Sequence, residues 1–334
     1  MSASLPPALV LTAGRGTRLA PLTDVRAKPA VPIAGIPLVV RVLRWLATQG
    51  VRSAVLNLHH KPETITRCVG SGSGLGIGVR YSWEPTLLGT AGGPRRALSL
   101  LGPRFFIVNG DTLTDVGLGD LAAAHEASGA DVTLAVTPHP APHRYGGALV
   151  DGAGWVRGFT APGADAARHF VGIQLVEASV FADLEDGQPT ASIGGLYDLL
   201  AQRDRRVIWA HQVATTFHEV GTPAEYLAVS LAIAATEGHD TIPLGERSEV
   251  HTTASLLRTA VWNDVVIGAG CRLVDCVVTD GVRLSENSVY DGQAIVATGG
   301  QNGIADAHGP PPPRVTPVER PSPARLHTSK RHDG

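Results

Sequence analysis

The chain has little of what would mark a membrane, secreted or zinc-binding protein. Its 334 residues contain no apolar run near the ~20 residues of a transmembrane helix. Residues 1–7 lack the basic start and apolar stretch of a secretory signal. The three cysteines, Cys68, Cys271 and Cys276, form no CxxC pair and show no zinc-ligand spacing. We therefore expect a cytoplasmic protein with no membrane span, whose thiols are plain buried side chains.

The chain also has no excess of positively charged residues. The formal net charge is −2, so no broad basic field exists to hold a nucleic acid backbone, and that class of partner is excluded. Histidine pairs offer no clear metal-ligand spacing either, which favours loop or solvated histidines at His59, His60, His139 and His143. The length allows one large α/β domain plus a smaller module.

Strands and helices are predicted to alternate through the first part of the chain. The predicted strands are 9–12, 54–58, 79–82, 105–108 and 132–136, and the predicted helices are 37–49, 62–69, 93–101 and 118–127. This alternation predicts an α/β fold with a Rossmann-like mixed, mostly parallel sheet flanked by helices. Ligands of such sheets bind beyond the carboxyl ends of strands. Two strand ends carry polar residues there: the loop after Thr12, and Asn109-Gly110-Asp111.

The sequence changes character after Gly238. Apolar residues recur every six positions in two runs with glycines between them, which predicts a short parallel β-helix of about two or three turns. The apolar positions are Val261, Ile267, Leu273, Val278 and Leu284. Residues 299–334 are rich in proline and are predicted to be disordered. We thus predict a catalytic domain at 1–237, a β-helix module at 238–298 whose open end serves oligomerisation, and a tail.

The loop at 11–32 concentrates glycine and positive charge. Gly14 and Gly16 follow a predicted strand and allow the backbone N–H groups to approach a phosphate chain closely, and Thr17 adds a hydroxyl. The loop also carries four cations, Arg15, Arg18, Arg26 and Lys28. Arginine suits a bidentate grip on phosphate and lysine acts as a mobile point charge. The composition therefore predicts a phosphate-binding loop.

Alternative readings of this loop fit less well. A dinucleotide-binding fingerprint needs a third glycine where this chain has Leu19, and a P-loop needs a Gly-Lys-Ser/Thr sequence that is missing. A plain glycine turn with solvated charges is the remaining alternative. Four cations and Thr17 within one proline-containing loop argue against it.

The runs 14–23, 28–29 and 32–37 resemble those of sugar-1-phosphate nucleotidyltransferases. The nearest members are the mannose-1-phosphate guanylyltransferases and the N-acetylmuramate-1-phosphate uridylyltransferases. The resemblance covers roughly residues 8–230 and includes the segments 84–93, 109–111, 145–147 and 219–223. It implies the nucleotide-diphospho-sugar transferase type of fold, in which a left-handed parallel β-helix is a recurrent C-terminal partner.

The resemblance also implies roles for individual residues. Arg18 matches the arginine that holds the leaving pyrophosphate, and Lys28 the lysine that contacts the reacting phosphates. The expected nucleotide-binding residues are Ala13, Gly14, Gly16, Thr17, Gly89, Thr90, Asn109 and Gly110. Gly147 and Gly172 match glycines of the sugar site. Asp111 and Glu219 match the two carboxylate ligands of Mg²⁺.

The implied chemistry needs no general base. A sugar-1-phosphate is mostly dianionic near neutral pH because its second pKa is about 6. It can attack the α-phosphorus of a nucleoside triphosphate directly, so catalysis consists of positioning and electrostatic stabilisation. Mg²⁺ bridging phosphate oxygens needs one or two protein carboxylates, with water and substrate as the other ligands.

The chain departs from the family pattern at several positions. Its second carboxylate is Glu219 instead of the usual Asp, with Phe217 in place of a tryptophan, and Ala27 replaces the proline before the loop lysine. The Glu-Lys-Pro stretch of the sugar site is Thr160-Ala161-Pro162 here. The candidates for the missing cation are Arg157, Arg168 and His169.

Three hypotheses follow from the sequence. The first is an enzyme that joins GTP to mannose-1-phosphate. The second is a uridylyltransferase that uses UTP with N-acetylmuramate-1-phosphate or another hexose-1-phosphate. The third is a non-catalytic regulator that binds sugar nucleotides, which the presence of Arg18, Lys28 and Asp111 disfavours.

Overall fold

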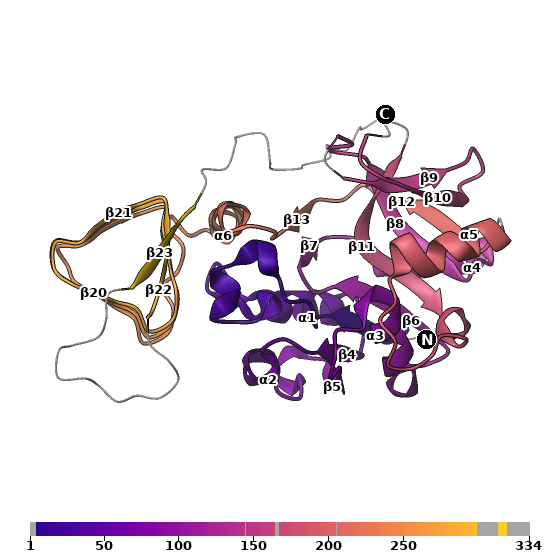
Figure 1. Ribbon diagram of the computed structural model, residues 1–334, viewed down its shortest axis with the longest axis horizontal. Coiled ribbons are helices and arrows are strands. Elements are labelled where there is room, and N and C mark those ends of the chain that lie inside the picture. Colours follow the sequence, from indigo (N-terminus) through magenta and orange to yellow (C-terminus); the bar gives the residue numbers. More distant parts are fainter. Residues whose placement is uncertain (1–4, 144, 164–166, 205, 299–312, 319–334) are drawn as a thin grey trace. The chain divides into compact units, whose positions relative to one another are not determined.

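The protein is described from a computed structural model over residues 5–143, 145–163, 167–204, 206–298 and 313–318 (Figure 1). These residues divide into two compact units. Residues 5–14 and 39–218 form the first, here called the sheet unit, and residues 15–38 and 219–318 form the second, the loop unit. Within the described ranges, no helix combines the length and the apolar character that crossing a membrane requires.

A nine-stranded mixed sheet forms the centre of the sheet unit. Its parallel half runs in the order β5 (Gly78–Trp83), β4 (Ser53–Leu58), β1 (Ala8–Leu11) and β6 (Arg104–Asn109). The other half comprises β8 (Val132–Pro138), β9 (Gly147–Val150), β10 (Val156–Thr160), β11 (Arg168–Glu177) and β12 (Ile208–Gln212). β11 pairs antiparallel with β6, so the parallel order ends there.

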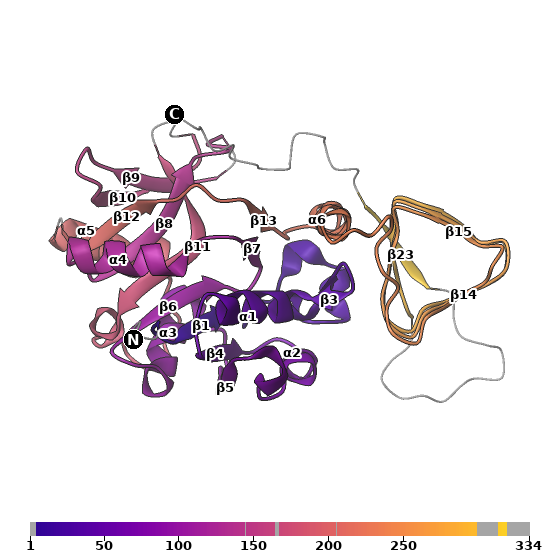
Figure 2. The same cartoon turned by 180° about the vertical axis from the view of Figure 1, so that it is seen from behind.

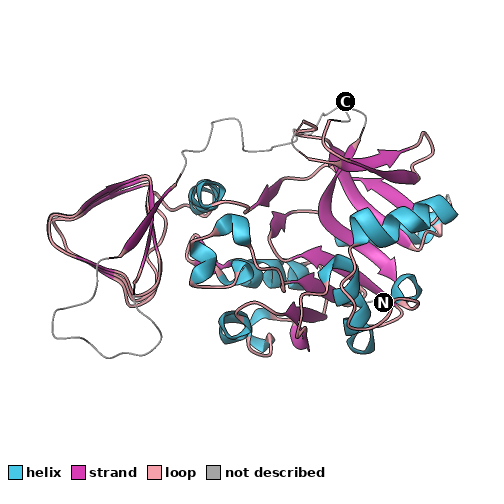
Figure 3. Ribbon diagram, viewed as in Figure 1, coloured by secondary structure: helices cyan, strands magenta, loops and turns pink. Residues whose placement is uncertain are grey.

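Helices flank this sheet, as Figures 2 and 3 show from opposite sides. They are α1 (Leu38–Thr48), α2 (Pro62–Val69), α3 (Gly89–Ala97), α4 (Leu118–Ser128) and α5 (Tyr197–Arg203). α3 packs on β1 and β4, α4 on β8, β11 and β12, and α5 on β10 and β12. The main core cluster lies between these layers and includes Leu9, Val55, Phe105, Ile107 and Tyr197. The predicted α/β fold with a mixed sheet and flanking helices is confirmed.

One helix begins earlier than predicted. α3 starts at Gly89, whereas the sequence analysis placed its start at Gly93. Acceptors from other parts of the chain bind N–H groups at this end of the helix. The Glu84 carboxylate accepts the Leu88 N–H at 2.9 Å, and the Thr190 carbonyl accepts the Ala91 N–H at 2.9 Å. Tertiary contacts therefore supply the helix cap that the local sequence does not indicate.

The loop unit begins with a chain of short turns. These are three 3-10 turns, η1 (Thr17–Leu19), η2 (Leu22–Asp24) and η3 (Lys28–Ala30), and a hairpin of β2 (Pro32–Ile33) and β3 (Ile36–Pro37). After β13 (Phe217–Glu219), which pairs with β7 (Thr112–Thr114), the chain enters α6 (Pro223–Thr236). The Thr222 hydroxyl caps α6 by accepting the Glu225 N–H at 3.2 Å.

Short strands then stack in three parallel sheets, which Figure 1 shows as a coil of triangular section. The first sheet contains β14 (Glu249–Val250), β17 (Val266–Ile267) and β20 (Arg283–Leu284). The second contains β15 (Ser255–Leu257), β18 (Arg272–Val274) and β21 (Val289–Asp291). The third contains β16 (Ala260–Val261), β19 (Val277–Val278) and β22 (Gln293–Val296). We call residues 249–296 the strand module. Its many short strands fit the predicted β-helix.

The repeat of the strand module is 17 residues, as the cross-coil hydrogen bond from Gly270 N–H to Thr253 shows. A strict period of six would require a longer coil. The coil is shortened at the corner between the second and third sheets, where Arg258, Asp275 and Gly292 have positive φ angles. Residues with positive φ also turn the other two corners, for example Asp264 and Gly270, where the apolar spacing stays six. The spacing drops by one because the link between the second and third sheets is only residues 275–276, whereas the other links are residues 262–265 and 268–271.

Part of the segment predicted to be disordered forms a strand. β23 (Arg314–Pro317) pairs antiparallel with β22, with Val315 opposite Ile295. β22 otherwise ends its sheet with unpaired backbone groups, and the added strand satisfies them. The prediction of disorder is therefore wrong for this strand. Residues 299–312 and 319–334 of the predicted tail lie outside the described residues.

Candidate active site

The two strand ends singled out from the sequence lie side by side. β1 and β6 are parallel neighbours, with Leu11 opposite Asn109. The Gly110 N–H donates to the Leu11 carbonyl at 3.0 Å. A Cβ at Gly110 would stand 2.5 Å from that carbonyl oxygen, so only glycine fits. Asp111 therefore leaves the sheet beside the start of the phosphate loop. β1 lies between β4 and β6, so the strands that follow it in the chain are added on its two opposite sides. Sheets of this kind bind ligands at such a point, beyond the carboxyl ends of the strands.

A buried carboxylate that the sequence analysis did not assign anchors this edge. Glu84 is 0% exposed and accepts hydrogen bonds from the Asn57 amide at 2.7 Å and the Leu88 N–H at 2.9 Å. The Asn57 side-chain oxygen in turn accepts the Thr12 N–H at 2.7 Å. The network ties the start of the phosphate loop to the start of α3. An asparagine inside the otherwise apolar strand β4 was the available sequence signal.

Gly89 and Thr90 lie at the first turn of α3 and contact the segment 188–192. Gly89 has φ +77°, and a Cβ there would meet the Thr190 carbonyl oxygen at 2.7 Å. The Thr90 hydroxyl oxygen accepts hydrogen bonds from both the N–H and the hydroxyl of Ser192, each at 2.8 Å. Both predicted residues thus belong to a tightly packed turn at a helix N-terminus, where backbone N–H groups favour anions.

Within the loop unit, Gly16 packs directly against Lys28. Gly16 has φ +63°, and a Cβ there would stand 3.0 Å from Cβ of Lys28 and 3.0 Å from Cγ2 of Thr23. The Thr23 hydroxyl donates to the Gly16 carbonyl at 3.2 Å. Gly16 is therefore held against Thr23 and Lys28, which lie later in the predicted phosphate loop, and the Lys28 side-chain stem lies against the glycine turn. Thr17 follows directly, in η1.

Arg18 lies beside the residues that follow Glu219. A Cβ at Gly221 would stand 3.5 Å from Nη1 of Arg18, and the Gly221 N–H donates to the Glu225 carboxylate at 3.1 Å. Glu219 is the last residue of β13. It belongs to the loop unit, while Asp111 belongs to the sheet unit.

The metal-ligand set is small. In the ranges that the structure describes, no group of three or more His, Cys, Asp or Glu side chains converges on one point. A closed zinc site needs about four protein ligands. Mg²⁺ at phosphate-transfer sites is held by only one or two carboxylates together with substrate oxygens. Carboxylate oxygens such as those of Asp111 and Glu219 are hard donors of the kind that Mg²⁺ prefers.

The two predicted sugar-site glycines are both required by close packing. Gly172 has φ +79°, and a Cβ there would stand 2.6 Å from Nδ2 of Asn109. It therefore lies against the residue that ends β6. Gly147 is buried, and a Cβ there would stand 2.9 Å from Cδ2 of His139 and 2.6 Å from the Arg168 carbonyl oxygen.

The structure separates the three candidates for the missing sugar-site cation. Arg157 forms an ion pair with Asp151. Arg168 lines a pocket with Asp151 and Trp209, and this pocket contains none of the predicted nucleotide residues. His169 instead stacks on Phe217, with ring centroids 5.1 Å apart, and lies edge-on to His139 at 5.3 Å. His169 thus contacts His139, the histidine beside Gly147.

The predicted phosphate loop and Asp111 follow adjoining parallel strands, an arrangement typical of nucleotide-binding α/β proteins. The family model described as "Nucleotidyl transferase" matches residues 7–235. The chain belongs to this nucleotidyltransferase family, so the predicted resemblance is confirmed.

Individual relatives agree with this assignment. The chain is 30% identical over 297 residues to the mannose-1-phosphate guanylyltransferase of Mycobacterium tuberculosis, covering 85% of this chain and 82% of the relative. It is 42% identical over 123 residues to the N-acetylmuramate alpha-1-phosphate uridylyltransferase of Neisseria meningitidis, covering 36% and 52%. The structure of HddC from Yersinia pseudotuberculosis, also solved complexed with GMP-PN, superposes with a TM-score of 0.60 at 22% identity, covering 69% of this chain and 100% of that chain.

Replacing the buried carboxylate tests the anchoring network. Glu84→Gln replaces one carboxylate oxygen by an NH₂ group, whereas the Asn57 amide and the Leu88 N–H both need an acceptor. One of these two buried donors therefore faces another donor in the variant. We expect a loss of about 2 kcal/mol in the free energy of unfolding, measured by urea denaturation. Glu63→Gln on α2, where the glutamate is exposed, is the control and should change stability by less than about 0.5 kcal/mol. Equal stabilities of the two variants would contradict the network.

Proposed function

We propose that the protein transfers a guanylyl group from GTP to mannose-1-phosphate, giving GDP-mannose and pyrophosphate. The observation that carries this proposal is the juxtaposition of the phosphate loop and Asp111 at the paired ends of β1 and β6. The Mycobacterium relative, whose similarity extends over most of both chains, bears a guanylyltransferase name. Its substrates are the best supported choice for this chain.

The reaction is a single displacement at the α-phosphorus. An oxygen of the sugar phosphate forms the new bond to the α-phosphorus, and the bond from that phosphorus to the β-phosphate oxygen breaks. The backbone N–H groups around Ala13, Gly14 and Gly16 receive the triphosphate, with Thr17 contributing a hydroxyl. Arg18 neutralises charge on the departing pyrophosphate, and Lys28 contacts the reacting phosphates. No side chain has to remove a proton, because the sugar phosphate is already a dianion.

Asp111 and Glu219 are the residues that would hold Mg²⁺. The ion would supply charge neutralisation between the phosphate groups when bound. Asp111 is suited to this role because it lies two residues after the last residue of β6, at the edge of the sheet where ligands of such folds bind. Glutamate at 219 keeps the charge of the family's aspartate and reaches one methylene further.

Nucleotide and sugar would be held by different parts of the sheet unit. Gly89 and Thr90 lie against the base and ribose, with Asn109 and Gly110 beneath the nucleotide. Gly147 and Gly172 leave room for the sugar, and His169 with His139 takes the place of the missing lysine.

A uridylyltransferase is the second candidate. The Neisseria relative has the higher identity, but over a shorter segment of 123 residues. This similarity favours UTP and N-acetylmuramate-1-phosphate as the alternative pair.

We also propose the domain organisation predicted from the sequence. Residues 1–237 would act as the catalytic domain and 238–298 as a left-handed parallel β-helix, in the cytoplasm. The open end of the β-helix would serve oligomerisation, because a truncated solenoid exposes its last coil.

A substrate panel tests the proposed activity. Purified protein with Mg²⁺ is offered GTP, UTP, ATP and dTTP against mannose-, glucose- and N-acetylmuramate-1-phosphate, and pyrophosphate release is measured. We expect the fastest release with GTP and mannose-1-phosphate, and its loss when EDTA removes the metal. Fastest release with UTP and N-acetylmuramate-1-phosphate would select the second candidate. Tight binding of a sugar nucleotide without release from any pair would identify a regulator.

Single substitutions test the residue roles. Asp111→Ala and Arg18→Ala should each lower kcat at least ~100-fold, because each removes charge stabilisation needed in the transition state. Arg67→Ala, at an exposed position of α2, removes the same charge elsewhere and should leave kcat unchanged. Near-normal turnover in either site variant, under conditions where the wild type is active, would refute the assigned role.

A further inference from the structure

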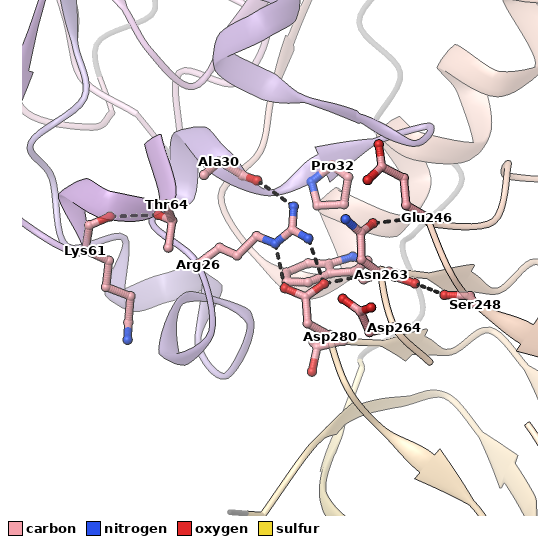
Figure 4. Close-up of polar contacts among 12 residues, drawn as sticks. Arg26, Ala30, Pro32, Lys61, Thr64, Glu246, Ser248, Asn263, Asp264 and Asp280 are labelled. Atoms are coloured by element: carbon pink, nitrogen blue, oxygen red, sulfur yellow. Dashed lines mark hydrogen bonds and ion pairs between the residues drawn. The ribbon is translucent and has the colours of Figure 1, made fainter. Parts of the chain in front are cut away.

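Arg26 is a cation of the phosphate loop to which the proposed chemistry gives no role. Its guanidinium forms two parallel hydrogen bonds with Asp280, from Nε to Oδ2 at 2.6 Å and from Nη2 to Oδ1 at 2.7 Å (Figure 4). Asp280 lies 254 residues further along the chain, in the strand module. The two side chains are only 16% and 26% exposed. A bidentate, largely buried pair of this kind fixes the position of both partners.

An aromatic pair supports the guanidinium. The carbon atom Cζ of Arg26 lies 5.4 Å from the ring centroid of Trp262, within the range of a cation–π contact. Trp262 is 1% exposed and donates its indole N–H to the Tyr226 hydroxyl at 2.7 Å. Tyr226 donates in turn to the Pro32 carbonyl at 2.8 Å, and burial raises the pKa of Tyr226, which keeps this donor protonated. The chain of contacts thus starts and ends on the phosphate loop.

Lys28 lies between the two points that this network holds. Arg26 precedes it by two residues, and Nη1 of Arg26 reaches the carbonyl of Ala30, two residues after it, at 3.5 Å. Between them η3 is closed by hydrogen bonds from Ala30 N–H to Ala27 at 2.8 Å and from Val31 N–H to Lys28 at 3.3 Å. The Lys28 stem then packs on Gly16. Moving Arg26 would therefore move the turn that carries Lys28.

A second ion pair joins the same stretch to the end of the chain. Asp24 pairs with Arg314 of β23. Both side chains are about half exposed, so this pair adds little stability by itself. Asp24 lies two residues before Arg26, so the pair with Arg314 restricts the movement of the loop on the N-terminal side of Arg26.

We propose that Asp280 is a positioning residue for nucleotidyl transfer, which acts through Arg26 to hold Lys28 in its reactive place. The strand module, by this account, completes the phosphate loop and does more than add stability. The proposal rests on the proposed function for its catalytic consequence, but the ordering of the loop by Asp280 is independent of which substrate is used.

The strand module contains a matched control for this pair. Arg258 and Asp275 form the same bidentate contact, at 2.6 and 2.7 Å, but both belong to the strand module and lie 17 residues apart. Arg258 is 48% exposed and Asp275 15%. Asp280→Asn and Asp275→Asn therefore make the same chemical change, and only the first touches the phosphate loop.

Hydrogen exchange tests the ordering directly. In Asp280→Asn the retained side-chain oxygen can still accept the Asn263 N–H, bonded at 3.0 Å in the wild type, while the new NH₂ group faces Arg26. We expect the amides of 24–31 to exchange about tenfold faster in Asp280→Asn than in wild type. The same amides should be unchanged in Asp275→Asn. Equal protection of this segment in all three proteins would overturn the proposal, whatever the activity of the chain.

Steady-state kinetics with the best substrate pair of the wild type tests the consequence. Asp280→Asn should lower kcat about tenfold with little change in KM for the triphosphate, because Lys28 is misplaced relative to the reacting phosphates. Arg26→Lys, which keeps the charge but not the two parallel bonds, should lie between wild type and Asp280→Asn. Asp275→Asn should match wild type.

A purely structural role predicts a different pattern. Asp280→Asn and Asp275→Asn would then lower Tm alike and leave kcat alike at a temperature where both are folded, and that outcome overturns the positioning role. If wild type itself releases no pyrophosphate while the exchange result is as expected, the proposed function fails and the ordering of the loop by Asp280 stands.

Discussion

The close approach of two backbones at the ends of β1 and β6 is the constraint on which the site depends. Gly110 passes so near the Leu11 carbonyl that a single methyl group would not fit. This contact sets Asp111 next to the residues that begin the phosphate loop. The buried Glu84 network then fixes the start of α3 to the same edge. The start of the predicted phosphate loop, Asp111 and the N-terminus of α3 therefore lie at one edge of the sheet.

The phosphate loop itself is not held by the sheet alone. After Gly14 the chain enters the loop unit, where its turns pack on Gly16 and on residues from the C-terminal part of the chain. Arg26 forms an ion pair with Asp280 and lies over the ring of Trp262. It therefore holds the loop in place, whereas the sequence suggested that it contacts phosphate. One cation of this glycine-rich loop is thus committed to the scaffold.

The sequence allowed prediction of features that depend on neighbouring residues. The Gly14–Gly16 turn, the polar ends of the strands and α2 (Pro62–Val69) follow from local spacing and from residue type. The Arg26–Asp280 pair did not, because nothing in the local sequence points to a partner 254 residues away. The same holds for β23, which forms only because β22 leaves an open edge. The period of six in the strand module was recognised, but the two-residue link between its second and third sheets, which makes the repeat 17 residues, was not.

Oxygen-isotope labelling most directly tests the central claim that an oxygen of the sugar phosphate becomes bonded to the α-phosphorus of the triphosphate while unlabelled pyrophosphate leaves. Mannose-1-phosphate carrying ¹⁸O in its phosphate is incubated with GTP and Mg²⁺, and both products are analysed by mass spectrometry. The account predicts that all label appears in GDP-mannose and none in pyrophosphate, because the bond broken is the one between the α-phosphorus and the oxygen leading to the β-phosphate. Label in pyrophosphate, or release of pyrophosphate without a labelled nucleotide sugar, would contradict it.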